Sequence, residues 1–540
     1  MTDAAPRLAA VAETLLGTPL PVRVRAWDGS EAGPPGTPIL VVHNRRALRR
    51  MLWKPGEMGL ARAWVAGELT VEGDLFELLD RVGGLLWARV PATPAPAPGT
   101  PALVPTVPAA PAPVPTVPAT PLRVNGSPPV LPAPVLPPPV LPASVLPPPV
   151  LPASVLPASV LPAPALAPPA LPATAPVPQG PAPRRPRLPG RLSRAADTAA
   201  LLRDPRARAA VRELAALARP WPAPAAPPEE ARRRGGPRHT RGGDRQAISH
   251  HYDVGNDFYE RVLGPSMVYS CAYWSPGGTL EEAQHDKLDL VCRKLALGPG
   301  DRLLDVGCGW GSMALHAARE YGVRVTGVTL SREQAAYARK RVADGGLADL
   351  VEIRIQDYRD VADGPYDAVS SIGMAEHVGA DRYRDYARTL YALLRPGGRL
   401  LNHQIARRPE PDEEAYRIND FIDAYVFPDG ELSPLGTTVG ELERAGFEVR
   451  DVEALREHYA LTLRAWVARL EAGWDEAVRL TSPGRARVWQ LYMAASALAF
   501  EHGRLGVNQV LAVKSAARGD AGVPLRPRTW GPGPEESPGA

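Results

Sequence analysis

The chain has 540 residues with 45% hydrophobic content, 65 prolines and a formal net charge of +4. That length is enough for two or three domains, but 36 of the prolines fall between residues 91 and 190, which excludes a packed core there. The N-terminus lacks a signal-peptide pattern and no apolar run approaches the roughly 20 residues of a membrane-spanning helix, so we expect a cytosolic protein. Cys271, Cys292 and Cys308 lie too far apart for a disulfide framework or a zinc site.

Residues 1–90 are predicted to form a small α+β accessory domain. Residues 22–27 alternate between apolar and polar side chains, as a half-buried strand does, and residues 38–43 form a second strand. Helices are predicted over 45–53 and 74–86, where apolar residues recur at three- and four-residue spacing. The pattern by itself indicates no chemistry for this domain.

Residues 91–245 are predicted to be a low-complexity linker, rich first in proline and then in arginine. Val-Leu-Pro occurs seven times with a five-residue period, starting at residue 130. Proline at this density prevents helices and sheet ladders and favours an extended polyproline II spacer. A binding role for its proline motifs is the alternative interpretation.

The basic part of the linker, residues 184–245, holds 16 Arg against 6 acidic residues, a charge of +10. Such a segment can meet anionic lipid headgroups or nucleic acid, or it can be a solvated linker. Only one aromatic residue, Trp221, is available for stacking, so we expect no nucleic-acid partner. A short helix is predicted over 195–218.

Residues 246–517 are predicted to form the catalytic domain, followed by a disordered tail over 518–540. Thr279-Leu-Glu-Glu282 has the pattern of a capping box at a helix start. Strand and helix patterns then alternate along the chain, at 323–328, 334–343, 351–355, 367–372, 383–394 and 396–405. This alternation indicates a doubly wound, mostly parallel sheet, in which ligands bind beyond the carboxyl ends of the strands.

A glycine-rich turn, Asp305-Val-Gly-Cys-Gly-Trp-Gly311, joins a short apolar strand to an amphipathic helix. Glycines there allow a ligand to approach main-chain N–H groups at a helix N-terminus, as in nucleotide sites. The spacing G-x-G-x-G differs from the G-x-G-x-x-G of dinucleotide-binding proteins, and no acidic residue ends the next strand. The turn resembles motif I of S-adenosylmethionine (SAM) methyltransferases.

Polar and aromatic residues cluster at the predicted strand ends. Glu376 and His377 follow one strand and His403 ends the next, while Tyr269-Ser-Cys-Ala-Tyr-Trp274 lies near the front of the domain. Cys271 could be a nucleophile for thioester chemistry, although nothing nearby in the sequence lowers its pKa. Each of these residues taken singly is also compatible with ordinary packing.

Several longer phrases occur in order: His251-Tyr-Asp-Val-Gly-Asn-Asp-Phe-Tyr259, Met267-Val-Tyr-Ser-Cys-Ala-Tyr-Trp274, Lys287-Leu-Asp-Leu-Val-Cys-Arg-Lys-Leu295, Gly327-Val-Thr-Leu-Ser-Arg-Glu-Gln334, Gln356-Asp-Tyr-Arg-Asp360, Ser371-Ile-Gly-Met-Ala-Glu-His-Val-Gly379 and Phe421-Ile-Asp-Ala-Tyr-Val-Phe-Pro428. With these phrases, residues 246–517 resemble the cyclopropane-fatty-acyl-phospholipid synthases and mycolic-acid cyclopropane synthases. Residues 20–90 resemble, more weakly, the N-terminal domain of the phospholipid-acting members. The Pro-rich insert has no counterpart in the family pattern.

The resemblance implies a Rossmann-like class I SAM-dependent methyltransferase domain and two sets of site residues. The SAM set consists of Tyr269, Ser270, Asp305, Gly307, Gly309, Gly311, Thr329, Gln334 and Tyr358. The family also binds a bicarbonate ion, whose ligands correspond to Cys271 (through its backbone), Glu376, His403, Ile405 and Tyr459. No metal is implied. Ala375, Asn402 and Gln404 depart from the family pattern, which affects the expected acyl-chain fit rather than the chemistry.

The function implied by this resemblance is methyl transfer from SAM to a cis double bond of an unsaturated phospholipid at the inner face of the cell membrane. Bicarbonate-assisted loss of a proton from the resulting carbocation would close a cyclopropane ring. One alternative loses a different proton and yields a methylene- or methyl-branched chain. A more distant one is a catalytically silent lipid-binding scaffold. Acyl-chain position, headgroup preference and oligomeric state, a homodimer included, stay open.

Overall fold

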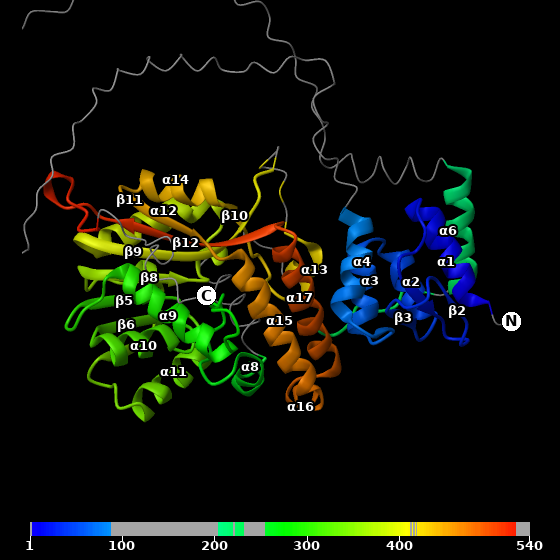
Figure 1. Cartoon of the computed structure of the whole chain (residues 1–540), viewed down its shortest axis with the longest axis horizontal. Coiled ribbons are helices and arrows are strands. Elements are labelled where there is room, and N and C mark those ends of the chain that lie inside the picture. The colour runs from blue at the N-terminus through cyan, green and yellow to red at the C-terminus, as the bar shows by residue number, and fades with distance from the viewer. Residues whose placement is uncertain are drawn as a thin grey trace, which may run out of the picture. The chain divides into compact units, whose positions relative to one another are not determined.

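The computed structural model describes residues 3–87, 204–219, 222–231, 254–410, 413, 416 and 418–524 (Figure 1). The predicted proline-rich spacer lies outside the described residues, as does most of the predicted tail. Of that tail, residues 518–524 are described, and Gly522 accepts a hydrogen bond of 2.6 Å from the guanidinium of Arg399. Within the described ranges, no helix has the length and apolar character needed to cross a membrane.

The N-terminal residues form the predicted α+β arrangement around a four-stranded sheet of order β2-β1-β3-β4. Strand β1 is parallel to β3 and antiparallel to β2, and β4 is antiparallel to β3. Its strands are β1 (Arg23–Arg25), β2 (Glu31–Ala32), β3 (Ile39–Val42) and β4 (Leu69–Glu72). Its helices are α1 (Ala4–Leu16), α2 (Arg46–Trp53), α3 (Glu57–Val65) and α4 (Leu75–Trp87).

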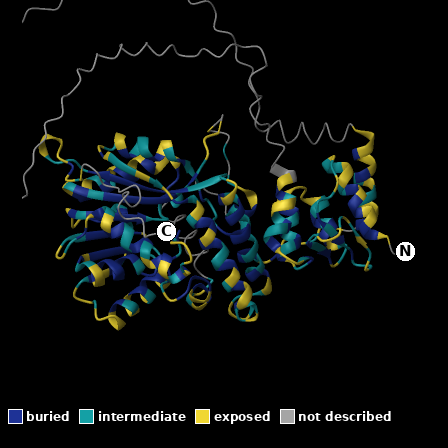
Figure 2. Ribbon diagram, viewed as in Figure 1, coloured by how far each residue is buried: buried dark blue, intermediate teal, exposed yellow. Residues whose placement is uncertain are grey.

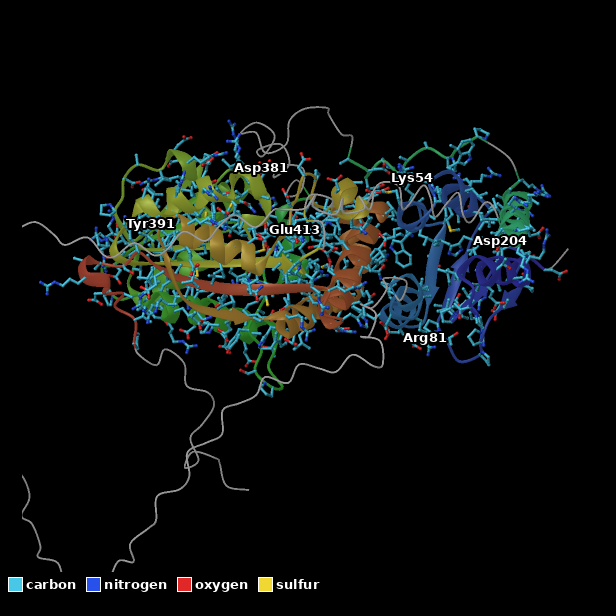
Figure 3. All side chains as sticks on the ribbon, turned by 90° about the horizontal axis from the view of Figure 1, so that it is seen from above. Lys54, Arg81, Asp204, Asp381, Tyr391 and Glu413 are labelled. Atoms are coloured by element: carbon cyan, nitrogen blue, oxygen red, sulfur yellow. The ribbon has the colours of Figure 1, made fainter. Side chains whose placement is uncertain are left out.

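Helix α6 (Pro205–Ala218) begins at Asp204, labelled in Figure 3, whose carboxylate accepts a hydrogen bond of 2.8 Å from the Arg206 N–H. It packs on α1 and α2, and the Arg49 side chain donates to its last carbonyl, that of Ala218, at 3.0 Å. The described part of the predicted helix is therefore present, but residues 204–219 and 222–231 belong to the folded unit rather than to a linker over 91–245. The high Arg and Pro content of this segment made the apolar face of α6 difficult to recognise from the sequence.

The catalytic domain is built on an eight-stranded sheet of order β11-β12-β9-β8-β5-β6-β7, with β10 paired to β9. The five strands from β9 to β7 are parallel, as predicted, whereas β12 is antiparallel to both β9 and β11. The strands are β5 (Arg302–Val306), β6 (Arg324–Thr329), β7 (Val351–Ile355), β8 (Tyr366–Ile372), β9 (Leu394–Arg407), β10 (Ser433–Pro434), β11 (Glu448–Ala454) and β12 (Leu505–Val513).

Helices cover both faces of this sheet (Figure 1). One face carries α9 (Leu280–Leu295), α10 (Ser312–Tyr321) and α11 (Arg332–Asp344), and the other carries α12 (Tyr383–Leu393) and α14 (Leu435–Arg444). The capping box predicted at Thr279 is present at the start of α9, and Ser331 caps α11. The strands are buried between the two layers, while the outer faces of the helices are exposed (Figure 2).

Three helices between β11 and β12 form a further layer that the periodicity did not predict: α15 (Arg456–Ala472), α16 (Trp474–Leu480) and α17 (Pro483–Glu501). Together with α8 (Asn256–Leu263) and α13 (Asp420–Tyr425), they enclose a hydrophobic core rich in aromatic residues. Helix α17 also contacts α3 and α4, and the indole of Trp64 donates to the carbonyl of Arg487 at 3.1 Å. Short 3-10 turns are η1 (Tyr358–Asp360), η2 (Ala375–His377), η3 (Ala380–Arg382) and η5 (Ala517–Gly519).

Candidate active site

The glycine-rich turn between β5 and α10 lies against a cavity of about 150 Å³. Gly307 and Gly309 line this cavity and have positive φ angles of 77° and 54°, which favour glycine. Gly311 is not among its lining residues: a Cβ there would lie 3.1 Å from the Cβ of Ala338 on α11. The structure thus places two of the three predicted glycines at the cavity and assigns Gly311 to helix packing.

The other predicted cofactor residues converge on the same cavity from four segments. The hydroxyl of Thr329, at the end of β6, donates to the side-chain oxygen of Gln334 at 3.0 Å. Ser331 accepts from the Gln334 N–H at 3.2 Å, so the cap of α11 holds this pair in place. The cavity is also lined by Tyr269, Ser270, Asp305 and Tyr358.

Asp305 is the buried carboxylate of this cavity, and its pKa is raised to about 6 by burial. Its Oδ1 accepts from the Ser370 hydroxyl at 2.7 Å, while its Oδ2 has no hydrogen-bond partner among the described residues. Lys287 on α9 lies near enough to favour the charged carboxylate, and its ammonium donates to Ser270 Oγ at 3.1 Å. Burial lowers the pKa of Lys287 to about 8.

A second, largely apolar cavity of about 320 Å³ contains all five residues of the predicted bicarbonate set: Cys271, Glu376, His403, Ile405 and Tyr459. These residues come from four segments of the catalytic domain, because His403 and Ile405 both lie on β9. The apolar wall is made by α13, α15, α17 and the ends of β9 and β12, and it includes Ile422, Phe427, Leu463, Tyr492, Phe500 and Val507.

Glu376 and His403 each present a buried polar atom without a partner among the described residues, Oε2 and Nε2 respectively. Glu376 Oε1 accepts from the Ile405 N–H at 2.8 Å, which orients the carboxyl group. Burial raises the pKa of Glu376 to about 7 and lowers the pKa of His403 well below its ordinary value. Buried polar atoms of this kind are normally satisfied, so this pair fits a small polar ligand.

Cys271 lies in the wall of this cavity as a buried thiol whose Sγ contacts the carbonyl of Leu455 at 3.5 Å. Burial raises its pKa well above the ordinary value, so the neutral thiol is favoured over a thiolate nucleophile. The thioester alternative therefore has no support from the geometry. The next residue is anchored to α15, because the Ala272 N–H donates to the Thr462 hydroxyl at 3.1 Å.

The two cavities adjoin each other, since Tyr269, Ser270, Gly373 and His377 line both of them. One side of this junction holds the glycine-rich turn, and the other holds the apolar chamber with Glu376 and His403. A group bound beside Gly309 can therefore lie next to an apolar molecule in the second chamber. Such an arrangement suits transfer of a small group between two bound molecules.

Sequence reasoning missed two kinds of site residue. Lys287 occupies the buried face of α9 together with Leu288 and Val291, and a lysine at a core position of an amphipathic helix is a signal that could have been noted. The residues of α17 that line the chamber, Tyr492 and Phe500 among them, are indistinguishable from core residues by pattern.

A family model described as mycolic acid cyclopropane synthetase matches residues 239–510. The chain belongs to this family. A probable fatty acid methyltransferase of Mycobacterium tuberculosis is 51% identical over 314 residues, covering 57% of this chain and 73% of that protein. The cyclopropane-fatty-acyl-phospholipid synthase of Escherichia coli is 38% identical over 269 residues, covering 50% of this chain and 68% of that protein.

Among solved structures, a mycolic acid cyclopropane synthase complexed with SAH and CTAB is 34% identical, with a TM-score of 0.47, covering 50% of this chain and 97% of that one. Numbered in chain order within the large sheet, and with β10 left aside, the strands run 3-2-1-4-5-7-6. This is the class I SAM-dependent methyltransferase fold expected from the sequence. As a member of the cyclopropane synthetase family, the chain is a SAM-dependent methyltransferase.

Proposed function

We propose that this cyclopropane synthetase family member transfers a methyl group from SAM to a cis double bond of an unsaturated phospholipid acyl chain and closes a cyclopropane ring. The observation that carries the proposal is the junction at Tyr269, Ser270, Gly373 and His377, where a glycine-loop cavity meets an apolar chamber. The chamber is largely apolar, and Glu376 and His403 each present a buried polar atom to it that has no partner among the described residues. A protein that only bound a cofactor, or only bound a lipid, would not need both the glycine-loop cavity and the apolar chamber.

The first cavity fits SAM by the chemistry of its lining. Bound SAM supplies an electrophilic methyl group. Gly307 and Gly309 leave room for a ligand beside the backbone, and the free Oδ2 of Asp305 can accept a hydrogen bond from an ammonium or hydroxyl group. The two adjoining cavities together would hold the methyl group and the double bond in line, within roughly 3 to 3.5 Å.

The apolar chamber fits an acyl chain, because its wall is built from aliphatic and aromatic side chains on α13, α15 and α17. Methyl transfer to an alkene leaves a carbocation on the chain, and ring faces stabilise such a cation by about 2 kcal/mol or more in a dry site. Tyr492 and Phe500 line the chamber, and Tyr459 packs its ring against Phe500 with centroids 4.8 Å apart.

The base for ring closure is proposed to be a bicarbonate ion, which supplies a proton acceptor next to the cation. Glu376 Oε2 and His403 Nε2 fit such an ion, because both are buried, line the chamber and have no other partner among the described residues. Glu376 is oriented by the Ile405 N–H, so its second oxygen is available to the ion. The chain's part in this step is to hold the ion in place and exclude water.

A second product is favoured by one specific comparison. The relative that is 51% identical is named a probable fatty acid methyltransferase, whereas the cyclopropane-fatty-acyl-phospholipid synthase is 38% identical. Loss of a different proton from the same carbocation gives a methylene-branched chain, and a methyl branch requires in addition a proton and a hydride from a separate reduced nicotinamide-type donor. The same residues serve both outcomes, so only the product distinguishes them.

The proposed substrate requires access to a membrane surface, and we propose peripheral association with the inner face of the cell membrane. The described residues offer no spanning helix, and the segment over 184–245 carries a charge of +10. Anionic headgroups attract such a segment by about 1 kcal/mol per Arg near the surface.

The test uses the purified full chain with SAM and vesicles of a cis-unsaturated phospholipid. Mass spectrometry should find acyl chains heavier by one CH₂, and proton NMR should find ring methylene signals. Vesicles of saturated phospholipid and a reaction without SAM are the controls. Vinylic signals in place of ring signals would establish the branched product. SAM binding without any mass gain would instead favour the lipid-binding scaffold.

A further inference from the structure

Gln509 on β12 lies directly opposite His403 on β9 in the antiparallel register of these strands. The side-chain nitrogen of Gln509 is 3.2 Å from His403 Nδ1, and both residues are buried, with 0% and 2% of their surfaces exposed. This contact is made by Nδ1, whereas the imidazole nitrogen without a partner among the described residues is Nε2. The two ring nitrogens of His403 therefore have different tasks.

The orientation of the Gln509 amide follows from its second partner, Lys294 on α9. The Lys294 ammonium is 2.7 Å from Gln509 Oε1, and an ammonium can only donate, so the atom facing it must be the amide oxygen. Lys294 is itself paired with Glu453 and lies 3.8 Å from Asp451, both on β11. The amide NH₂ of Gln509 must consequently point at His403.

An amide NH₂ has no acceptor capacity, so His403 Nδ1 must accept this hydrogen bond with its lone pair. The imidazole is kept neutral by burial and by the positive charges of Lys287 and Lys294, which lower its pKa. A neutral ring that accepts at Nδ1 carries its proton on Nε2. Groups that face this region from the neighbouring elements are Lys287 and Lys294 on α9, Glu376 on η2, Asp451 and Glu453 on β11, Tyr459 on α15 and the Cys271 thiol.

From this geometry we infer that Gln509 and Lys294 are positioning residues, which hold His403 as a fixed Nε2–H donor directed at the anion of the apolar chamber. The inference rests on the proposed function, because it assigns a role toward the bicarbonate ion. It also has a mechanistic consequence. With its proton already on Nε2, neutral His403 has no lone pair there, so it donates to the ion and does not itself take the proton from the acyl chain.

Gln509→Met keeps the side-chain length and removes the amide, so the tautomer of His403 is no longer held. We expect kcat to fall by about tenfold or more, as loss of a buried hydrogen bond implies. The bicarbonate concentration for half-maximal rate should rise, while SAM affinity measured by calorimetry stays within about twofold. Ser515→Ala is the matched control, since Ser515 follows the end of β12 and bonds only the exposed Glu448 in the described structure.

A spectroscopic readout tests the relay without any turnover. In the full chain labelled with ¹⁵N-histidine, the signals of His403 are assigned by their loss in His403→Asn. The wild-type chain should show an unprotonated Nδ1 and a protonated Nε2 across neutral pH. In Gln509→Glu, a carboxylate replaces the amide donor, and Nδ1 should become protonated.

The possible outcomes separate the two proposals. A wild-type chain that adds no CH₂ to unsaturated lipid contradicts the proposed function, while the NMR measurement still decides the tautomer. Active wild type together with an unchanged kcat and bicarbonate dependence in folded Gln509→Met would overturn the positioning role. A protonated Nδ1 in the wild-type chain would overturn it as well, even if Gln509→Met does not fold.

Discussion

At the scale of single residues, the site contains buried titratable side chains whose charged forms are disfavoured by burial. Glu376 is the clearest example, because its pKa is raised to about 7 and its orienting partner is a backbone N–H rather than a cation. Burying a carboxylate without a countercharge costs stability that a purely structural position would avoid. That cost is typical of a residue kept for function.

Glu376→Gln preserves the acceptor for the Ile405 N–H but removes the ionisable group. We expect SAM affinity by calorimetry to stay nearly unchanged and turnover on unsaturated lipid to fall by about 100-fold or more, since the carboxyl group is assigned to the base and not to the cofactor. A variant with full activity in bicarbonate-depleted buffer would contradict that assignment.

The same substitution should raise stability in a pH-dependent way. The folded-state pKa of Glu376 lies above its ordinary value of 4.5, so between pH 4.5 and about 7 the folded chain holds a proton that the unfolded chain has released. Wild-type stability therefore falls as pH rises through this window, and Glu376→Gln does not share the loss. Urea denaturation should show the advantage of the variant growing by up to about 3 kcal/mol between pH 4.5 and pH 8. An advantage that is equal at both pH values would show that Glu376 titrates normally.

The glycine-rich turn allows a matched pair of substitutions. A Cβ on Gly309 meets only the Gln334 amide at 4.0 Å, so Gly309→Ala projects into the cofactor cavity. We expect SAM affinity to fall by about tenfold or more, with a modest stability loss of about 1 kcal/mol from the positive φ. Gly311→Ala instead presses on Ala338 and should lower stability more than it lowers SAM affinity. Calorimetry and thermal denaturation of both variants check this prediction. A SAM affinity of Gly309→Ala equal to that of the wild-type chain would show that Gly309 does not contact the cofactor.

At the scale of elements, the end of the predicted linker supports the wall of the apolar chamber. The Glu230 carboxylate accepts two hydrogen bonds from Arg62 on α3, at 2.6 and 2.8 Å, and one of 2.9 Å from the Tyr425 hydroxyl on α13. The Ala231 N–H also donates to the carbonyl of Ala424 at 2.7 Å. Ile422 on α13 lines the apolar chamber, so this junction connects the N-terminal elements to the chamber wall.

Glu230→Gln should loosen this junction while leaving the cofactor cavity intact. We expect a loss of about 1–3 kcal/mol in stability, because the partly buried Arg62 guanidinium loses its countercharge. The KM for lipid should rise by several-fold, with SAM affinity unchanged. Arg261→Gln, which removes an exposed pair with Glu476, serves as the control and should change stability by less than about 1 kcal/mol. If Glu230→Gln behaves like this control, the Glu230 carboxylate does not contribute to holding α13 in place.

At the scale of the whole molecule, the described residues that line the two cavities fall between 267 and 507. Residues 92–188, which contain most of the proline-rich stretch, fall outside the unit formed by residues 1–91 and 189–540. The composition of this stretch suits a spacer, which at roughly 3.1 Å per residue can reach far when extended.

A deletion that joins residue 90 to residue 184 removes the repeats and retains the basic segment. We expect activity on detergent-dispersed unsaturated lipid to remain within about twofold of the full chain, since every described residue that lines a cavity is retained. Activity on vesicles should change through the altered spacing. Loss of the detergent activity in a folded deletion variant would show that the stretch does more than connect.

The sequence by itself determined the elements whose signals are local. The strand-turn-helix around Gly307, the caps at Thr279 and Ser331, and the parallel core of the sheet depend on backbone preferences and short-range periodicity, which are legible in a single chain. The resemblance of whole phrases then pointed to the residues of both cavities. Only the tertiary structure separated Gly311, which packs on Ala338, from the glycines that line a cavity. It alone brought Gln509 and Lys294 to His403 and made α17 part of the wall of the apolar chamber. These contacts join segments more than 100 residues apart, and the side-chain pattern does not record which distant face a residue will meet.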